Sequence, residues 1–221
     1  MCGRFIFTAD RADLVLALAG LRIEELLHPR YNIAPTQPVP TVLNDGQRTL
    51  TQTRWGLIPS WTKDPSIGNR LINARAETLA EKPSFRAPLK RQRCLIWATG
   101  FYEWQKMGKG KQPMLFQLTS KKPFAFAGLW DRWEGADGDE VITSTIITTE
   151  ANGLVAPVHE RMPVILAPEH YESWLTPGEQ RVEPLLAVLG PYPADQMLSY
   201  PVSTQVNSPA VDGPVCIEPV I

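Results

Sequence analysis

The residue with the most distinctive chemistry in this sequence is a cysteine at position two. Once Met1 is removed, Cys2 carries an amine and a thiol on neighbouring carbons, and such a 1,2-aminothiol can close a five-membered ring around an aldehyde. The ordinary pKa values, about 8 for the amine and about 8.5 for the thiol, leave part of each group nucleophilic at neutral pH. Gly3 permits close backbone approach to a ligand, and Arg4 adds a fixed positive charge. The alternative is an incidental cysteine in a frayed terminus.

Two further residues have the chemistry of proton transfer. Glu103 lies between Tyr102 and Trp104, and burial there raises the pKa of a carboxyl group toward the range of a general acid or base. Strand alternation is equally consistent with an exposed Glu103. His159 lies in a short loop before a predicted strand, which is a common position for a proton-transfer residue. The alternative for a lone histidine is a structural, hydrogen-bonded role.

Charge is distributed unevenly along the chain. Residues 1–122 carry 19 Lys and Arg against 9 Asp and Glu, and residues 123–221 carry 3 against 14, so a net charge of −1 conceals halves of opposite sign. The basic half also contains Trp55, Trp61 and Trp104, and single-stranded nucleic acid favours this mixture of charges for phosphates and rings for bases. A solvated basic face is the alternative. A tryptophan in the loop from Trp55 to Trp61 is equally expected to be an exposed ring on which a base stacks or a buried anchor in the core.

The composition indicates an ordinary globular protein. The chain has 221 residues, of which 43% are hydrophobic and 20% charged, and we expect one domain over residues 1–221. It contains no run of about 18 apolar residues and no signal-peptide pattern, so we expect a cytoplasmic protein without a membrane partner. Its three cysteines, Cys2, Cys94 and Cys216, lack metal-ligand spacing, so we expect no disulfide framework, no metal and no cofactor. Nothing argues for more than a monomer.

Patterning predicts several short helices and many strands. A helix capped by Thr8 is expected over residues 8–19, and Asp45-Gly46 predicts a hairpin between strands 40–44 and 48–55. Asn73 and Arg75 lie where a loop runs into a short helix, and they offer an amide and a phosphate-binding guanidinium. The remaining predictions are strands at 93–105, 113–118, 124–133, 141–148 and 199–203, and helices at 168–175 and 181–189.

Six motifs occur together and in order. They are Met1-Cys2-Gly3-Arg4-Phe5, Arg30-Tyr31-Asn32-Ile33-Ala34-Pro35, Trp55-Gly56-Leu57-Ile58-Pro59, Asn73-Ala74-Arg75-Ala76-Glu77-Thr78, Gly100-Phe101-Tyr102-Glu103-Trp104 and His159-Glu160-Arg161-Met162-Pro163. In this arrangement, which extends to about residue 170, the sequence resembles the SRAP (SOS-response-associated peptidase) family. The resemblance implies an α+β, mainly β fold: a single compact domain with a barrel-like antiparallel sheet and flanking short helices.

The resemblance also implies a function. Members of the family lose Met1 and use Cys2 to form a covalent thiazolidine crosslink with single-stranded DNA at abasic sites, which shields the lesion in the SOS response to DNA damage. The family name records a peptidase activity on the residues before Cys2, and a bacterial member is expected at the nucleoid. Two alternatives remain: an N-terminal-nucleophile cysteine hydrolase, and a non-covalent module for single-stranded DNA.

The hypothesis assigns two groups of residues. The expected catalytic residues are Cys2, Asn73, Glu103 and His159. The expected DNA-binding residues are Arg4, Arg75, Arg161, Trp104 and, less directly, Trp61.

Overall fold

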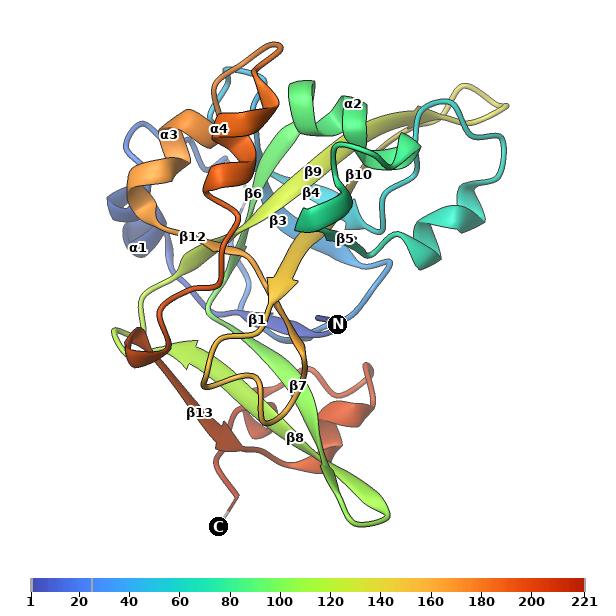
Figure 1. Cartoon of the computed structure of the whole chain (residues 1–221). Coiled ribbons are helices and arrows are strands. Elements are labelled where there is room, and N and C mark those ends of the chain that lie inside the picture. The colour runs from blue at the N-terminus through green and yellow to red at the C-terminus, as the bar shows by residue number, and fades with distance from the viewer. Residues whose placement is uncertain (1, 25, 221) are drawn as a thin grey trace.

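A closed five-stranded barrel forms one half of the molecule in the computed structural model, which describes residues 2–24 and 26–220 (Figure 1). Each barrel strand pairs with two others, in the order β10-β4-β3-β6-β9 and back to β10. Only the β10–β4 pair is parallel. The strands are β3 (Pro38–Leu43), β4 (Leu50–Trp55), β6 (Arg93–Ala98), β9 (Phe124–Glu134) and β10 (Glu140–Glu150).

A second, five-stranded antiparallel sheet lies beside the barrel in the order β13-β8-β7-β1-β2. The chain passes into it where β6 leads into β7, and Gly100 lies at this crossing. A Cβ atom on Gly100 would lie 2.8 Å from the carbonyl oxygen of Phe116, so the crossing requires glycine. These strands are β1 (Phe5–Phe7), β2 (Arg30–Ile33), β7 (Gly100–Met107), β8 (Gly110–Leu118) and β13 (Met197–Pro201). In Figure 1, β1 runs between the barrel and the rest of this sheet.

Three short strands complete the barrel edges. β5 (Asn73–Arg75) pairs in parallel with β10, and β11 (Arg161–Pro163) pairs with β10 in antiparallel orientation. β12 (Ile165–Leu166) pairs with β9. Strand β10 therefore brings together two segments that are more than eighty residues apart in the sequence.

The helices are short. α2 (Pro83–Arg91), α3 (Tyr171–Trp174) and α4 (Val182–Ala187) lie around one end of the barrel, and α1 (Arg11–Ala17) lies lower beside it (Figure 1). Six 3-10 turns are Pro65–Arg70, Ala76–Thr78 (η2), Pro168–His170, Ala194–Gln196, Thr204–Asn207 (η5) and Pro214–Cys216. Within the part of the chain that the structure describes, no helix is both long and apolar enough to cross a membrane.

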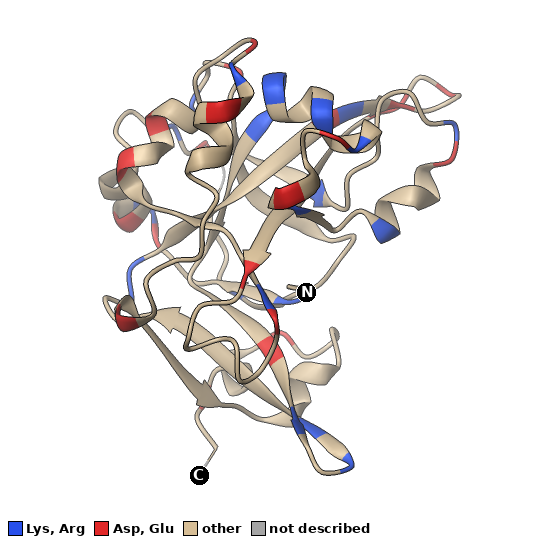
Figure 2. Cartoon of the chain, viewed as in Figure 1, with Lys and Arg blue, Asp and Glu red and all other residues tan. Residues whose placement is uncertain are grey.

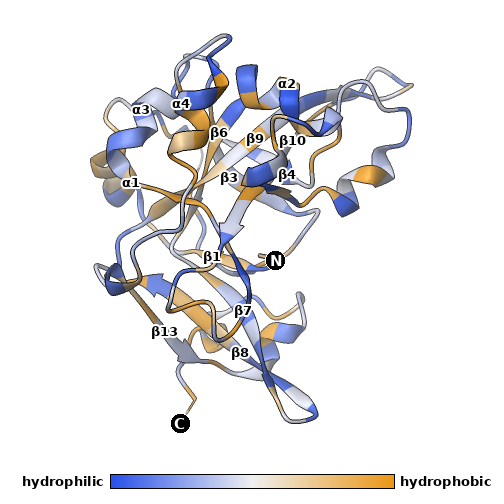
Figure 3. Ribbon diagram, in the orientation of Figure 1, coloured by the Kyte–Doolittle hydropathy of each residue, from blue (hydrophilic) through white to orange (hydrophobic). Residues whose placement is uncertain are grey.

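Apolar side chains form two clusters. The larger fills the barrel and includes Trp55, whose indole Nε1 donates a hydrogen bond to the carbonyl of Ile72 at 2.9 Å. The smaller lies under the second sheet and includes Ile6, Tyr102 and Val206. Figure 3 shows the corresponding apolar stretches on β1 and β6. Trp55 is thus a core anchor, and its hydrogen bond holds the chain just before β5.

The predicted fold class is confirmed, and two element boundaries are corrected. Helix α1 begins at Arg11 because Asp10, not Thr8, caps it by accepting a hydrogen bond from the amide of Asp13 at 2.9 Å. The Thr8 hydroxyl instead lies 3.0 Å from that of Thr99. The predicted strand 93–105 is two strands, β6 and β7, that belong to different sheets. The Asp45-Gly46 hairpin is confirmed, whereas the domain limits 1–221 stay a prediction.

Candidate active site around Cys2

Cys2 lies just before β1 and is fully buried. The side-chain amide of Asn73 donates a hydrogen bond to the Cys2 carbonyl at 2.8 Å, which ties the N-terminal segment to β5. Burial raises the pKa of the Cys2 thiol far above its ordinary value, and the nearby Glu103 carboxyl adds to this shift. The thiol is therefore protonated at neutral pH in the free protein. Cys2 is therefore not part of a frayed terminus.

Glu103 faces Cys2 because of strand alternation in β7. Successive side chains point to opposite sides of a strand, so Glu103 shares a side with Phe101 while Tyr102 and Trp104 point the other way into the smaller core. Glu103 is only 4% exposed, which excludes the exposed alternative. Burial raises the pKa of the Glu103 carboxyl, and the neighbouring His159 opposes that rise. The raised pKa was predicted, but Glu103 does not share a face with its flanking aromatic residues.

His159 and Asn73 approach the site from the two segments that β10 brings together. Asn73 is paired with Ile146 of β10, and His159 lies two residues before the start of β11. The imidazole Nδ1 accepts a hydrogen bond from the backbone amide of Arg161 at 3.0 Å. The same nitrogen lies 3.2 Å from the carbonyl of Arg161, so the Arg161 backbone can hold Nδ1 whether or not this nitrogen carries a proton.

The Asn73 side chain has one hydrogen-bonding group left over. Its nitrogen donates to the Cys2 carbonyl, but its buried oxygen accepts no hydrogen bond from any residue within 2–24 and 26–220. A buried amide oxygen without a donor is costly, and such groups are frequent where a ligand completes the site. This oxygen can accept a hydrogen bond from an amine or hydroxyl group placed beside Cys2.

Arg75 and Arg161 differ in what they already bind. Arg75 lies at the end of β5 and is exposed. Arg161 forms a two-pronged ion pair with Glu77, with nitrogen–oxygen distances of 2.7 and 2.9 Å, and it also donates to the carbonyl of Thr148 at 2.7 Å. Arg75 can meet a phosphate directly, whereas a phosphate reaching Arg161 must share it with Glu77.

Arg4 is held by the second sheet and by the C-terminal segment. Its Nη1 donates to the side-chain oxygen of Asn32 at 2.6 Å and to the carbonyl of Val206 at 2.7 Å. Its guanidinium carbon lies 5.9 Å from the ring centre of Trp104, which is a cation–π distance. Burial lowers the pKa of Arg4 from its ordinary value. The side chain therefore has a structural function irrespective of any contact with DNA.

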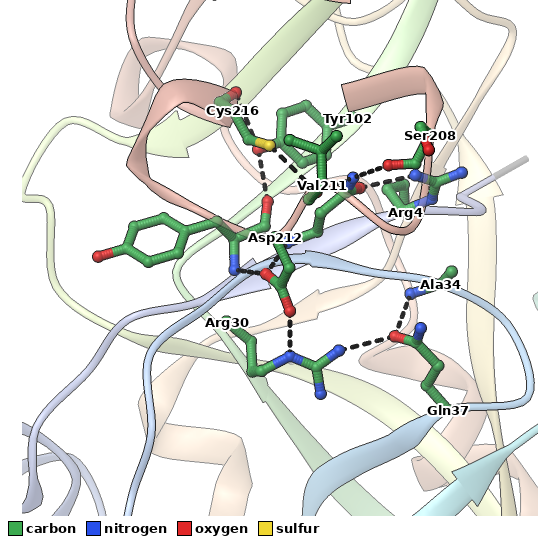
Figure 4. Close-up of polar contacts among 11 residues, drawn as sticks. Arg4, Arg30, Ala34, Gln37, Tyr102, Ser208, Val211, Asp212 and Cys216 are labelled. Carbon is green, nitrogen blue, oxygen red and sulfur yellow. Dashed lines mark hydrogen bonds and ion pairs between the residues drawn. The ribbon is translucent and has the colours of Figure 1, made fainter. Parts of the chain in front are cut away.

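Asn32 is the centre of this cluster. Its side-chain nitrogen donates to the carbonyls of Val206, Ser208 and Val211 at 3.1, 2.9 and 2.7 Å. Asp212 accepts from the backbone amide of Asn32 at 2.9 Å and also forms an ion pair with Arg30 (Figure 4). Sequence reasoning assigned no function to Asn32 or to residues 204–217. The motif that contains Asn32 was the only available signal.

The two candidate stacking residues have different surroundings. Trp61 is 63% exposed in the loop after β4. Trp104 is half-buried, and its indole donates to the side chain of Asn207 at 2.7 Å. Trp61 can present a ring face to a ligand freely, while Trp104 is already partly covered by Arg4.

Basic side chains do not gather in one patch. Figure 2 shows one group on α2 and another at the tip of the β7–β8 hairpin, with the N-terminal segment between them. Lys82 and Arg86 belong to the first group, Lys106 and Lys109 to the second, and all four are exposed. A strand of nucleic acid crossing the site could therefore meet positive charge on both sides.

Comparison with known proteins identifies the family. The family model described as "SOS response associated peptidase (SRAP)" matches residues 1–209. The chain belongs to the SRAP family. The resemblance seen in the six motifs is thereby confirmed.

Curated SRAP relatives include both bacterial and vertebrate proteins. The abasic site processing protein YoqW of Bacillus subtilis (strain 168) is 47% identical over 225 residues, which cover 99% of each chain. The abasic site processing protein HMCES of Gallus gallus is 36% identical over 264 residues, which cover all of this chain and 78% of HMCES. A crystal structure of a protein from Bacteroides thetaiotaomicron covers all of both chains with a TM-score of 0.88 at 28% identity.

Proposed function

We propose that this SRAP protein binds single-stranded DNA at an abasic site and links to it covalently through Cys2 once Met1 has been removed. The observation that carries the proposal is the convergence of Asn73, Glu103 and His159 on Cys2 from three distant segments. The name "abasic site processing protein" borne by the relatives supports the same lesion as substrate. Met1 lies outside the described residues, and while it is attached the Cys2 nitrogen is an unreactive amide.

The proposed reaction joins one aldehyde to one aminothiol and releases one water. The Cys2 amine attacks the C1′ aldehyde of the opened sugar, and loss of the aldehyde oxygen as water leaves a Schiff base. The Cys2 sulfur then bonds to the same carbon, and the thiol proton ends on the nitrogen. The product is a five-membered thiazolidine ring that keeps the DNA attached.

Glu103 is proposed to carry the protons in this sequence. It accepts a proton from the attacking amine and returns it to the departing oxygen, which requires a carboxyl whose pKa lies closer to neutrality than usual. Burial raises the pKa of Glu103 in this direction. The Cys2 thiol also needs a proton acceptor at ring closure, because its own pKa is raised by burial and by Glu103.

His159 and Asn73 are proposed to act on the sugar and on the nucleophile. In its charged form, His159 can pass its Nε2 proton to the ring oxygen O4′ as the sugar opens, and the neutral ring that remains keeps its proton on Nδ1, beside the carbonyl of Arg161. The unsatisfied oxygen of Asn73 can hold the Cys2 amine in line with the aldehyde, and such orientation contributes several kcal/mol in related reactions.

The proposed DNA contacts are assigned from the exposure of the arginine and tryptophan side chains. Arg75 is proposed as the principal phosphate ligand, and Trp61 as a stacking surface for a base. Arg4, Arg161 and Trp104 would contribute with the part of each side chain that the protein does not already use. We further propose that the protein acts as a cytoplasmic or nucleoid monomer, and that its peptidase activity is the removal of Met1.

Intact mass under denaturing conditions tests the proposal. The purified protein should lack Met1 and, after incubation with single-stranded DNA carrying one abasic site, should gain the mass of the DNA less one water. Cys2→Ala should give no adduct that survives heating. Cys2→Ser keeps the amine but not the thiol, so its adduct should persist only after reduction of the Schiff base.

Other outcomes would redirect the assignment. A heat-stable adduct with Cys2→Ala would overturn the ring chemistry. Turnover of a small amide without an adduct would favour the hydrolase. Salt-sensitive DNA binding that Cys2→Ser leaves unchanged, again without an adduct, would favour a non-covalent binding module.

A further inference from the structure

Glu77, Arg161 and His159 form a connected chain of contacts beside the reactive cysteine. Glu77 lies in η2, two residues after the end of β5, and Arg161 is the first residue of β11. The two side chains meet in the paired contacts of 2.7 and 2.9 Å. The backbone amide of Arg161 in turn donates to the imidazole of His159. The Glu77 carboxylate is thus linked through Arg161 to the imidazole of His159, although the two residues are far apart in the sequence.

We propose that Glu77 is a positioning residue for His159, acting through Arg161 to hold the imidazole Nδ1 against the Arg161 backbone and so to fix the direction of Nε2. This inference rests on the proposed function, in which His159 protonates O4′. Glu77 itself touches neither the substrate nor a reacting atom.

The backbone of Arg161 can partner His159 in either protonation state. Its amide lies 3.0 Å from Nδ1 and donates to the neutral ring, while its carbonyl lies 3.2 Å from the same nitrogen and can accept from the charged ring. A histidine that gains and loses a proton during a reaction needs such a partner in both states. The position of the Arg161 backbone therefore determines which tautomer is present and where Nε2 points.

Strand pairing alone gives that backbone little support. β11 has only three residues, and Arg161 is at its end, where strands fray. The Arg161 guanidinium compensates by bonding to Glu77 in η2 and to the carbonyl of Thr148 in β10. It joins three segments at one point, and among the described residues Glu77 is the only carboxylate that forms an ion pair with it.

The chain contains a matched pair for comparison. Glu179 also pairs with an arginine, Arg91, whose Nε and Nη2 donate to one of its oxygens at 3.1 and 2.7 Å, and both glutamate side chains are 51% exposed. The arginines differ: Arg161 is 13% exposed and Arg91 is 65% exposed. Glu179→Ala is therefore a control that removes a similar ion pair from a surface remote from Cys2.

The first test reads the imidazole directly and needs no DNA. Nitrogen-15 NMR should show the wild-type His159 ring as one predominant tautomer when neutral. In Glu77→Ala the two ring nitrogens should move toward averaged shifts, whereas Glu179→Ala should leave them unchanged. An unaltered tautomer in Glu77→Ala would overturn the inference, and a thermal melt establishes that each variant is folded.

The second test separates DNA binding from reaction. With saturating abasic-site DNA, Glu77→Ala should slow crosslink formation about tenfold, as expected when a catalytic group loses its alignment. Its DNA affinity should be equal or tighter, because a negative charge has been removed. Glu77→Gln, which keeps one acceptor, should lie between Glu77→Ala and the wild type. A Glu77→Ala variant that weakens binding but reacts at the wild-type rate would overturn the positioning role.

The two proposals fail in different ways. If the wild type forms no adduct, the proposed crosslinking function is wrong, yet the tautomer measurement still tests the link from Glu77 to His159. If the wild type reacts and Glu77→Ala reacts equally fast, only the positioning role is lost.

Discussion

The site has two sides that are built from different interactions. The sheet side comprises β1, β2, β7 and residues 204–217, and its polar groups are buried and mostly paired through neutral hydrogen bonds around Asn32. The barrel side comprises β5, η2, β10 and β11, and it is held by the half-exposed ion pair of Glu77 and Arg161. Buried hydrogen bonds are costly to break, whereas an ion pair at the surface contributes little to stability. We infer that the sheet side anchors the N-terminal segment through Arg4, and that the barrel side orients the nucleophile through Asn73 and meets the substrate.

The largest effect is expected at the centre of the sheet side. Asn32→Ala leaves the carbonyls of Val206, Ser208 and Val211 without their shared donor, so unfolding should become easier by about 3 kcal/mol or more. Urea unfolding measures this change. Asn207→Ala removes one hydrogen bond to Trp104 near the surface and should cost about 1 kcal/mol or less. Equal losses in the two variants would contradict the difference drawn between buried and exposed contacts.

Glu103→Gln should affect the reaction more than the fold. Without a carboxyl to exchange protons, crosslink formation should slow about 100-fold, measured by quenched gel assays at saturating DNA. The amide has nearly the same size, so the variant should remain folded. A wild-type rate in Glu103→Gln would assign proton transfer to another group.

Stability should respond to pH through Glu103 in an unusual direction. Because burial raises the pKa of Glu103 in the folded protein, its contribution is fully present below the ordinary pKa of about 4.5 and is lost as pH rises through the higher folded value. Each unit of difference between the pKa of Glu103 in the folded and in the unfolded protein corresponds to about 1.4 kcal/mol of folding stability. The stability of Glu103→Gln relative to wild type should therefore grow over this range and then level off. A constant difference between the two proteins would mean that the carboxyl pKa is ordinary.

Arg75→Gln tests whether the barrel side meets the DNA backbone. Loss of one phosphate contact should lower the slope of log affinity against log salt by about 0.7 for a single strand. Binding titrations at several salt concentrations measure this slope. Arg132→Gln, another exposed arginine, is the control because it is already paired with Glu140 and lies outside both basic groups. Identical slopes for the two variants would remove Arg75 from the interface.

The smallest effect concerns Glu77, whose pH dependence has the opposite sign to that of Glu103. Arg161 lowers the pKa of Glu77, so the ion pair contributes above the ordinary pKa of about 4.5 and is lost as pH falls through the lower folded value. Because Glu77 is half-exposed, we expect less than about 1 kcal/mol between wild type and Glu77→Gln at neutral pH. Acid unfolding curves of the two proteins should converge at low pH, and curves that stay apart would contradict the assignment.

Local patterns predicted much of the sheet architecture but not its long-range contacts. Alternation and turn residues located the hairpin at Asp45-Gly46 and most of the strands between residues 93 and 149. Helix α2 was missed because Pro83 and Pro88 lie within it, and proline ordinarily interrupts a helix. The division of residues 93–105 at Thr99 was also missed, since only the tertiary fold shows that the two parts join different sheets.

The site was predicted by residue type and not by geometry. The motifs identified Cys2, Asn73, Glu103 and His159, and the structure brings these residues together. No local pattern could show that Arg161 pairs with Glu77, 84 residues away, or that Asn32 holds carbonyls of the C-terminal segment. The phosphate-binding functions of Arg4, Arg75 and Arg161 stay predictions.

The hydrogen bonds that hold Arg4 can form only late in the synthesis of the chain. Arg4 and its partner Val206 are separated by 202 residues, so a ribosome adding about 5 to 20 residues per second needs roughly 10 to 40 s between them. During that interval the first residues leave the ribosome before the carbonyls that later hold Arg4 have been made. The start of the nascent chain is thus open to processing before residues 204–217 close over Arg4.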